Sequence, residues 1–64
     1  MQEATQEQYE ALRRTCKRML EDTNFAGYSG INFIDFTKYL DKLKVEFPEL
    51  KFRQTDFGIS VDKI

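Results

Sequence analysis

The chain has 64 residues and a formal net charge of −1, with 10 Lys and Arg against 11 Asp and Glu, and it contains no His, no Trp and a single Cys. A chain of this length is expected to form one small domain, residues 1–64. Without His and with one Cys, it cannot supply a Ser–His or Cys–His nucleophile, a Cys/His zinc site or an internal disulfide, so we expect a protein that is not an enzyme and holds no cofactor.

The first predicted element is a helix over about residues 5–23. Thr5 can cap this helix, and Gln8 three residues later completes a capping box. Apolar residues then recur at the spacing of one helix face. The residues of this face are Tyr9, Leu12, Cys16, Met19 and Leu20. Since Cys16 lies within the apolar face, we expect a small buried side chain rather than a reactive thiol.

The same helix carries the basic side chains of Arg13, Arg14, Lys17 and Arg18. At helical spacing they share one arc, which could face the phosphates of a nucleic acid. Acidic residues stand three or four positions away, at the spacing of ion pairs along a helix. This pattern favours a salt-bridged, solvent-exposed face, and a small nucleic-acid-binding regulator that uses the Arg13–Arg18 face is kept as an alternative function.

A loop over residues 24–31 precedes a second predicted helix over about residues 32–47. Asn32 can cap this helix, Asp35 suits its first turn, and Pro48 ends it. Its apolar residues are spaced 3-4-3-4, which predicts an αα-hairpin whose two apolar faces meet in the core. The residues expected to be most buried are Leu12, Cys16, Met19, Phe33, Phe36, Leu40 and Leu43.

The last segment of the chain changes to a two-residue period. Leu50 and Phe52 alternate with charged residues, and the alternation resumes after a slip in phase over residues 54–57. We therefore expect a short C-terminal β-hairpin, with strands at about residues 50–54 and 57–63. Added to the αα-hairpin, it gives an α+β fold.

A third helix is the alternative reading of residues 48–57. Pro48 would occupy its first turn and Gly58 would follow its last. This alternative predicts an all-α, three-helix fold, and the sequence leaves the choice between strand and helix open.

Residues 29–40 resemble the second half of an EF-hand. The residues that match that family's pattern are Gly30, Ile31, Phe33, Asp35 and Phe36, with Asn24 as the first ligand. Ala26 and Tyr28 stand where oxygen-bearing side chains belong, and Asp35 is shorter than the usual bidentate Glu. The resemblance implies a degenerate helix–loop–helix module that does not bind calcium, and this is a further alternative function.

A chain without these catalytic and metal-binding groups is expected to act by fitting its surface to that of another molecule. We expect a small regulator or inhibitor that binds another protein through an aromatic and apolar surface, in the style of proteins from phages or mobile elements. The predicted partner-binding residues are Phe25, Tyr28, Ile34, Tyr39, Val45, Ile59 and Val61. Ile34 and Val45 fall on the back of the second predicted helix.

The last predicted strand has few charges and no Pro near residues 58–62. We expect it to form an open sheet edge that pairs with a partner strand or with a second copy of the chain, which would give a homodimer. The polar N-terminus is not a signal peptide, and no apolar run approaches the ~20 residues of a membrane span. With one Cys, this predicts a cytoplasmic protein.

Overall fold

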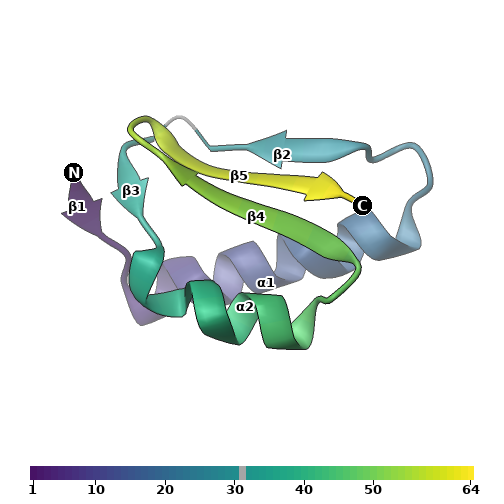
Figure 1. The fold of residues 1–64 in the computed structure, drawn as a ribbon, viewed down its shortest axis with the longest axis horizontal. Coiled ribbons are helices and arrows are strands. Elements are labelled where there is room, and N and C mark those ends of the chain that lie inside the picture. Colours follow the sequence, from purple (N-terminus) through teal and green to yellow (C-terminus); the bar gives the residue numbers. More distant parts are fainter. Residues whose placement is uncertain (31) are drawn as a thin grey trace.

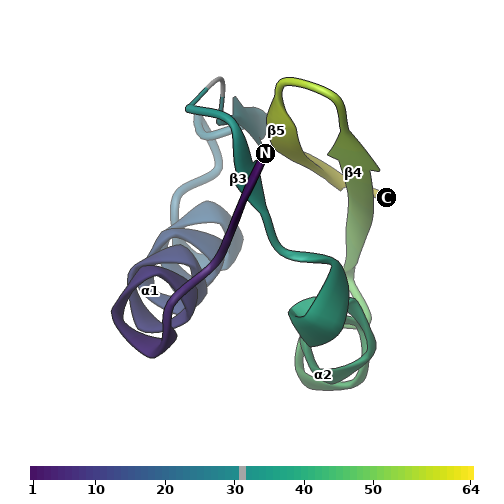
Figure 2. The ribbon, with the colours of Figure 1, turned by 90° about the vertical axis from the view of Figure 1, so that its left-hand side faces the viewer.

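Two helices lie on the same face of a three-stranded antiparallel sheet (Figures 1 and 2). The structure is a computed structural model that describes residues 1–30 and 32–64. In chain order the elements are β1 (Gln2–Glu3), α1 (Gln6–Glu21), β2 (Gly27–Ser29), β3 (Ile34–Asp35), the 3-10 turn η1 (Thr37–Tyr39), α2 (Leu40–Glu46), β4 (Leu50–Thr55) and β5 (Gly58–Lys63).

The last strand in the chain is the middle strand of the sheet, whose order is β2-β5-β4. Val61 of β5 stands opposite Phe52 of β4 on one side and opposite Tyr28 of β2 on the other. A second, smaller sheet joins β1 and β3 in parallel, with Gln2 opposite Ile34. The N-terminal residues are therefore held against the middle of the chain.

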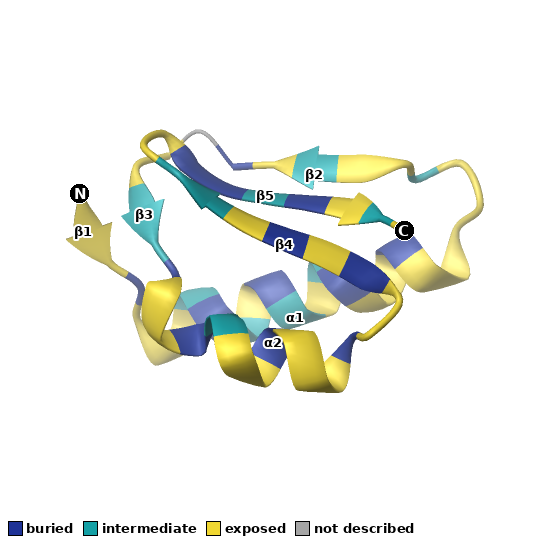
Figure 3. Ribbon diagram, viewed as in Figure 1, coloured by how far each residue is buried: buried dark blue, intermediate teal, exposed yellow. Residues whose placement is uncertain are grey.

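The core lies between the inner face of the sheet and the apolar faces of the helices (Figure 3). Residues alternate between buried and exposed along β4, as expected for a sheet with one face in solvent. The buried apolar residues are Ala4, Tyr9, Leu12, Cys16, Met19, Phe36, Tyr39, Leu43, Phe47, Leu50, Phe52, Ile59 and Val61.

Helix α1 begins as the sequence predicts. The Thr5 side chain accepts a hydrogen bond from the Gln8 backbone N–H, and the Gln8 side chain accepts one from the Thr5 N–H at 2.8 Å. This reciprocal pair satisfies two backbone donors that a helix N-terminus leaves free.

The predicted αα-hairpin is wrong. Residues 27–29 and 34–35 form strands between the helices, and the second helix starts at η1 rather than at residue 32. Asn32 does not cap it; instead the Asp35 carboxylate accepts the Thr37 backbone N–H at 2.9 Å, where η1 begins. Ile34 and Asp35 are instead held in a strand by pairing with β1, which includes the hydrogen bond from the Ala4 N–H to the Asp35 carbonyl at 2.8 Å.

The helix–loop–helix outline expected from the EF-hand resemblance is also absent from the described residues. An EF-hand loop gathers its ligands around one ion. Here Tyr28 belongs to a strand that pairs with β5, and Asp35 belongs to a strand that pairs with β1. Of that pattern, Ile31 lies outside the described residues.

The C-terminal strands lie where the alternation predicts them, as β4 and β5, so the three-helix alternative is wrong. The predicted sheet of two strands is wrong as well, because β2 adds a third strand. β5 is therefore paired on both sides and is not the open edge that the sequence suggested. The sequence missed β2 because Gly27-Tyr28-Ser29 offers one apolar residue and no alternation.

Five of the seven predicted core residues are buried, which confirms that part of the prediction: Leu12, Cys16, Met19, Phe36 and Leu43. Leu40 is half-buried. Phe33 is 56% exposed, because it precedes β3 instead of joining a helix face.

Gly58 opens β5 in a conformation that suits glycine alone. Its φ is 144°, and a Cβ at this position would overlap the Gly30 carbonyl oxygen. The close approach brings the Gly30 N–H within 2.9 Å of the Ile59 carbonyl, where β2 meets β5. Because Gly58 has no side chain, the start of β5 can pack directly against the backbone at the end of β2.

Candidate functional site

The seven predicted partner-binding residues divide into three groups. Tyr39, Ile59 and Val61 are buried, at 7%, 2% and 0% exposure, so these three side chains do not lie on the surface of the fold. Phe25, Tyr28 and Ile34 are half-buried and pack against the core. Val45 is 83% exposed.

Burial of the first group has a direct cause. Ile59 and Val61 point inward from the central strand, and Tyr39 stacks on Tyr9 of α1, with ring centroids 4.2 Å apart and planes within 6°. Ile34 is not on the back of a helix with Val45, because Ile34 belongs to β3. The surface predicted from the sequence therefore does not exist as one surface.

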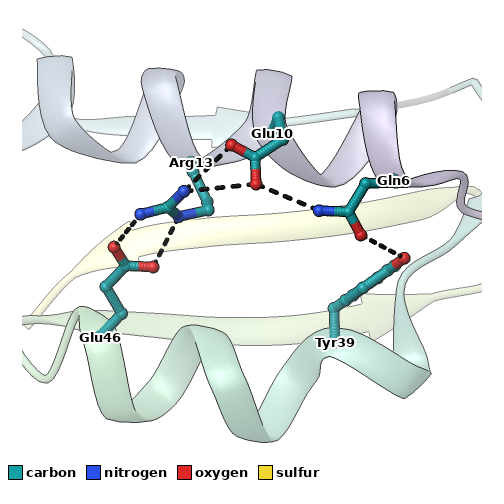
Figure 4. A network of polar contacts seen from close by, with 5 residues as sticks. All are labelled: Gln6, Glu10, Arg13, Tyr39 and Glu46. Atoms are coloured by element: carbon teal, nitrogen blue, oxygen red, sulfur yellow. Dashed lines mark hydrogen bonds and ion pairs between the residues drawn. The ribbon is translucent and has the colours of Figure 1, made fainter.

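A shallow hollow of about 410 Å³ lies between α1 and α2. It is lined by Tyr9, Asp41, Lys42, Val45 and Glu46. Beside the hollow, a chain of polar contacts joins the two helices (Figure 4). The Arg13 guanidinium donates to both carboxylate oxygens of Glu46 and also to Glu10, while the Tyr39 hydroxyl donates to Gln6 at 3.5 Å.

The bidentate ion pair fixes the charges of its members. Donation from Arg13 lowers the pKa of Glu46 below its ordinary value of 4.5, and the carboxylate in turn raises the pKa of Arg13. Burial, followed by the nearby Glu46 charge, raises the pKa of Tyr9. The network therefore stays ionised as a helix-to-helix clamp around neutral pH.

Acid is expected to weaken this clamp. A carboxyl group whose pKa is lower in the folded state stabilises the fold above its unfolded pKa, and loses that contribution as the pH falls through the folded pKa. We expect the pH dependence of unfolding below about pH 4.5, the ordinary Glu value, to be shallower in Glu46→Gln than in the native protein. Urea titrations at several pH values measure it; Glu49→Gln, a change at an exposed carboxyl outside the network, serves as the control. If the free energy of unfolding depends on pH equally in the native protein and in Glu46→Gln, the Glu46–Arg13 ion pair is not the cause of the acid sensitivity.

The end of the molecule that holds the β4–β5 turn carries two exposed aromatic rings, which we call the aromatic tip: Phe33 and Phe57. They are 56% and 61% exposed, and their rings meet edge to face with centroids 6.1 Å apart. The Phe33 N–H donates to the Phe57 carbonyl at 2.9 Å, so the two backbones are tied together. Met1, whose sulfur lies 3.5 Å from Gln54 Nε2, is also exposed at 60%.

Phe33 has a backbone φ of 58°. The left-handed region costs an L-residue roughly 1–2 kcal/mol, and a bulky aromatic residue is rarely found there. The conformation is held from both sides, since the Gln2 N–H donates to the Phe33 carbonyl at 3.2 Å. The fold thus keeps an unfavourable backbone at a residue whose ring is largely in solvent.

The sequence interpretation missed both residues of the tip. It placed Phe33 on a helix face and Phe57 within a strand. A usable signal exists for Phe57, because the slip in phase over residues 54–57 marks a turn, and side chains at a hairpin turn are exposed. No local signal places Phe33, whose position depends on pairing with β1 and on the bond to Phe57.

Gln54 holds β3 against the sheet. Its side-chain Oε1 accepts the Phe36 N–H at 2.9 Å, and its Nε2 donates to the Ile34 carbonyl at 3.1 Å. Both backbone groups are only partly exposed, so removing their partner leaves them poorly satisfied.

We expect Gln54→Ala to destabilise the fold by about 1–3 kcal/mol through the unmet backbone groups. Amide exchange should show the loss at Phe36 and its neighbours before it reaches the β4–β5 hairpin. Thr55→Ala, which also removes a side-chain hydrogen bond but at the turn, is the control. Uniformly faster exchange in Gln54→Ala would contradict a local role for this side chain.

The basic face of α1 is less available than its sequence indicates. Arg13 is engaged by Glu46 and Glu10, as described above. Arg14, Lys17 and Arg18 are exposed. Among residues 1–30 and 32–64, no cluster of three or more Cys, Asp or Glu side chains is arranged to hold a metal ion.

Comparison with known protein families, curated proteins and solved structures finds no match to this chain. Within the described part of the chain, neither helix has the length and apolar character needed to cross a membrane.

Proposed function

We propose that this protein is a non-enzymatic regulator or inhibitor that binds another protein through its aromatic tip, Phe33 and Phe57. The observation that carries the proposal is the exposed Phe33 ring on a left-handed backbone, at φ 58°. Paired aromatic anchors of this kind are typical of the residues that dominate the binding energy of protein interfaces.

The tip does little for the fold that holds it. An exposed ring contributes little burial, while the Phe33 backbone conformation opposes folding. Unfavourable conformations that the surrounding structure enforces are concentrated at functional sites. The aromatic tip therefore has the properties expected of a binding site: its rings are exposed, and its backbone conformation lowers the stability of the fold.

A cytoplasmic location belongs to the same proposal. Cys16 is fully buried, and burial raises the pKa of its thiol to about 11, so it is poorly placed to pair with a second thiol. Single unpaired cysteines are usual in reducing compartments.

Substitution of Phe33 by Asn separates binding from folding. Asn tolerates the left-handed region, so Phe33→Asn is expected to keep the native free energy of unfolding or to raise it by about 1 kcal/mol. Binding should nevertheless be lost with the ring. A clear loss of thermal stability in this variant would contradict the strain argument.

Binding is measured by site-specific photocrosslinking in lysate of the source cells. A crosslinking residue at position 56, beside Phe57, should give a discrete protein adduct that Phe33→Asn and Phe57→Ser both remove. The matched control places the crosslinking residue at position 44, on the exposed side of α2. The same adducts from both positions, or adducts that survive both substitutions, would show that the tip is not the binding element.

A further inference from the structure

The outer edge of β4 is a second surface, independent of the aromatic tip. β4 is six residues long and pairs with β5 on one side only. No strand of the described chain pairs with its other edge, and α2 lies beneath β4 on the side of the sheet that both helices cover (Figures 1 and 2). An edge of this length offers a row of backbone groups to an added strand.

The register shows which backbone groups face outward. The Ile64 N–H donates to the Glu49 carbonyl at 3.2 Å. Bonded and non-bonded pairs alternate along an antiparallel ladder, so Lys51 and Arg53 turn their backbone groups toward β5. Phe52 and Gln54 therefore turn theirs away from the sheet. Their side chains, in contrast, are on the inner face, where Phe52 is buried and Gln54 holds β3.

The two charged side chains of β4 itself are both positive. Lys51 and Arg53 are exposed on the solvent face of the sheet, and neither is in an ion pair among the described residues. Asp62 stands opposite Lys51 and Ser60 stands opposite Arg53 in β5. A strand added beyond β4 would bring its own side chains opposite these two cations.

A second copy of the chain is a poor occupant. Antiparallel pairing of two β4 strands about Phe52 would place Lys51 of each copy opposite Arg53 of the other, and in-register parallel pairing would align identical cations. Like charges directly opposite one another destabilise a strand pair. The exposed face of the sheet also offers no aromatic ring from β2, β4 or β5 on which the bases of a nucleic acid could stack.

We propose that β4 binds an extended segment of another protein that carries acidic side chains at alternate positions, added to the sheet as a fourth strand. The outward groups of Phe52 and Gln54 supply the backbone hydrogen bonds. Lys51 and Arg53 select the segment by charge, through carboxylates on the same face two residues apart.

Synthetic peptides test the inference directly. One peptide alternates Thr or Val with Glu, a second has Lys in place of each Glu, and a third has the Glu pattern interrupted by Pro. At low ionic strength the Glu peptide should bind about tenfold more tightly than the Lys peptide, from two cross-strand charge pairs. Binding should shift the amide signals of residues 50–55 and slow exchange of the Phe52 and Gln54 amides. The Pro peptide should bind more weakly than the Glu peptide.

Charge variants provide the controls. Lys51→Gln/Arg53→Gln removes two exposed positive charges and should abolish the preference for Glu over Lys, while Arg14→Gln/Lys17→Gln removes two from α1 and should keep it. Equal binding of both peptides, a preference that only the α1 variant removes, or amide shifts outside β4 would overturn the inference. So would tighter binding of a single-stranded oligonucleotide than of the Glu peptide at the same salt concentration.

Discussion

Gly58→Ala is expected to unfold much of the protein. The added methyl group overlaps the Gly30 carbonyl oxygen, which is backbone and cannot rotate away, and alanine at a φ of 144° is strained in any case. Backbone strain and overpacking together predict a loss of about 3–5 kcal/mol. Domains of this size have little stability beyond that amount. Circular dichroism and urea titration measure the effect.

Gly27→Ala is the matched control in the same sheet. A Cβ at Gly27 meets the Asp62 carboxylate, an exposed side chain that is able to move, at 2.8 Å, and it meets the Val61 carbonyl oxygen at 3.2 Å, whereas a Cβ at Gly58 would lie 1.7 Å from the Gly30 carbonyl oxygen. We expect a much smaller loss, within about 1 kcal/mol, which is typical of surface changes that create no cavity or unmet polar group. If both variants lose the same stability, close approach of Gly58 to β2 is not the reason for its effect.

Leu43→Ala should have the second large effect. Leu43 is fully buried in α2, and truncating a buried leucine to alanine costs about 2–5 kcal/mol through lost burial and the cavity left behind. The thermal midpoint should fall by about 8 °C or more, since about 1 kcal/mol shifts it by 4–8 °C in a domain of this size.

Two other residues of α2 provide comparisons for the stability loss of Leu43→Ala. Val45 is 83% exposed, so Val45→Ala should change stability by no more than about 0.5 kcal/mol. Leu40 is half-buried, so Leu40→Ala should fall between the other two. An order of effects other than Leu43, Leu40, Val45 would contradict the packing described for α2.

Features that depend on neighbours in the chain were predictable. Thr5 and Gln8 cap α1 because their partners lie three residues apart, and Pro48 follows the end of α2 for a similarly local reason. The strands β4 and β5 were also predictable from alternating apolar and polar residues, because each strand has one face in the core and one in solvent.

Features that depend on distant pairing were not predictable. Phe33 and Phe36 continue a helical spacing with α2, but backbone bonds from Gln2 and Ala4 pair Ile34 and Asp35 with β1 and keep this segment out of the helix. Tyr28 has no alternating neighbours, and its strand exists because β5 pairs with it. The candidate site follows the same division: Phe33 is exposed only because of those distant bonds, so its role cannot be inferred from spacing.

The position of β5 also affects the order in which the protein can fold. During synthesis β2 and β4 leave the ribosome before residues 58–63, so neither has its strand partner until those residues emerge. The apolar faces of both helices are complete before the sheet that covers them. Consolidation of the native sheet therefore begins only once β5 is free of the ribosome, and until then the nascent chain exposes the side chains of its own core.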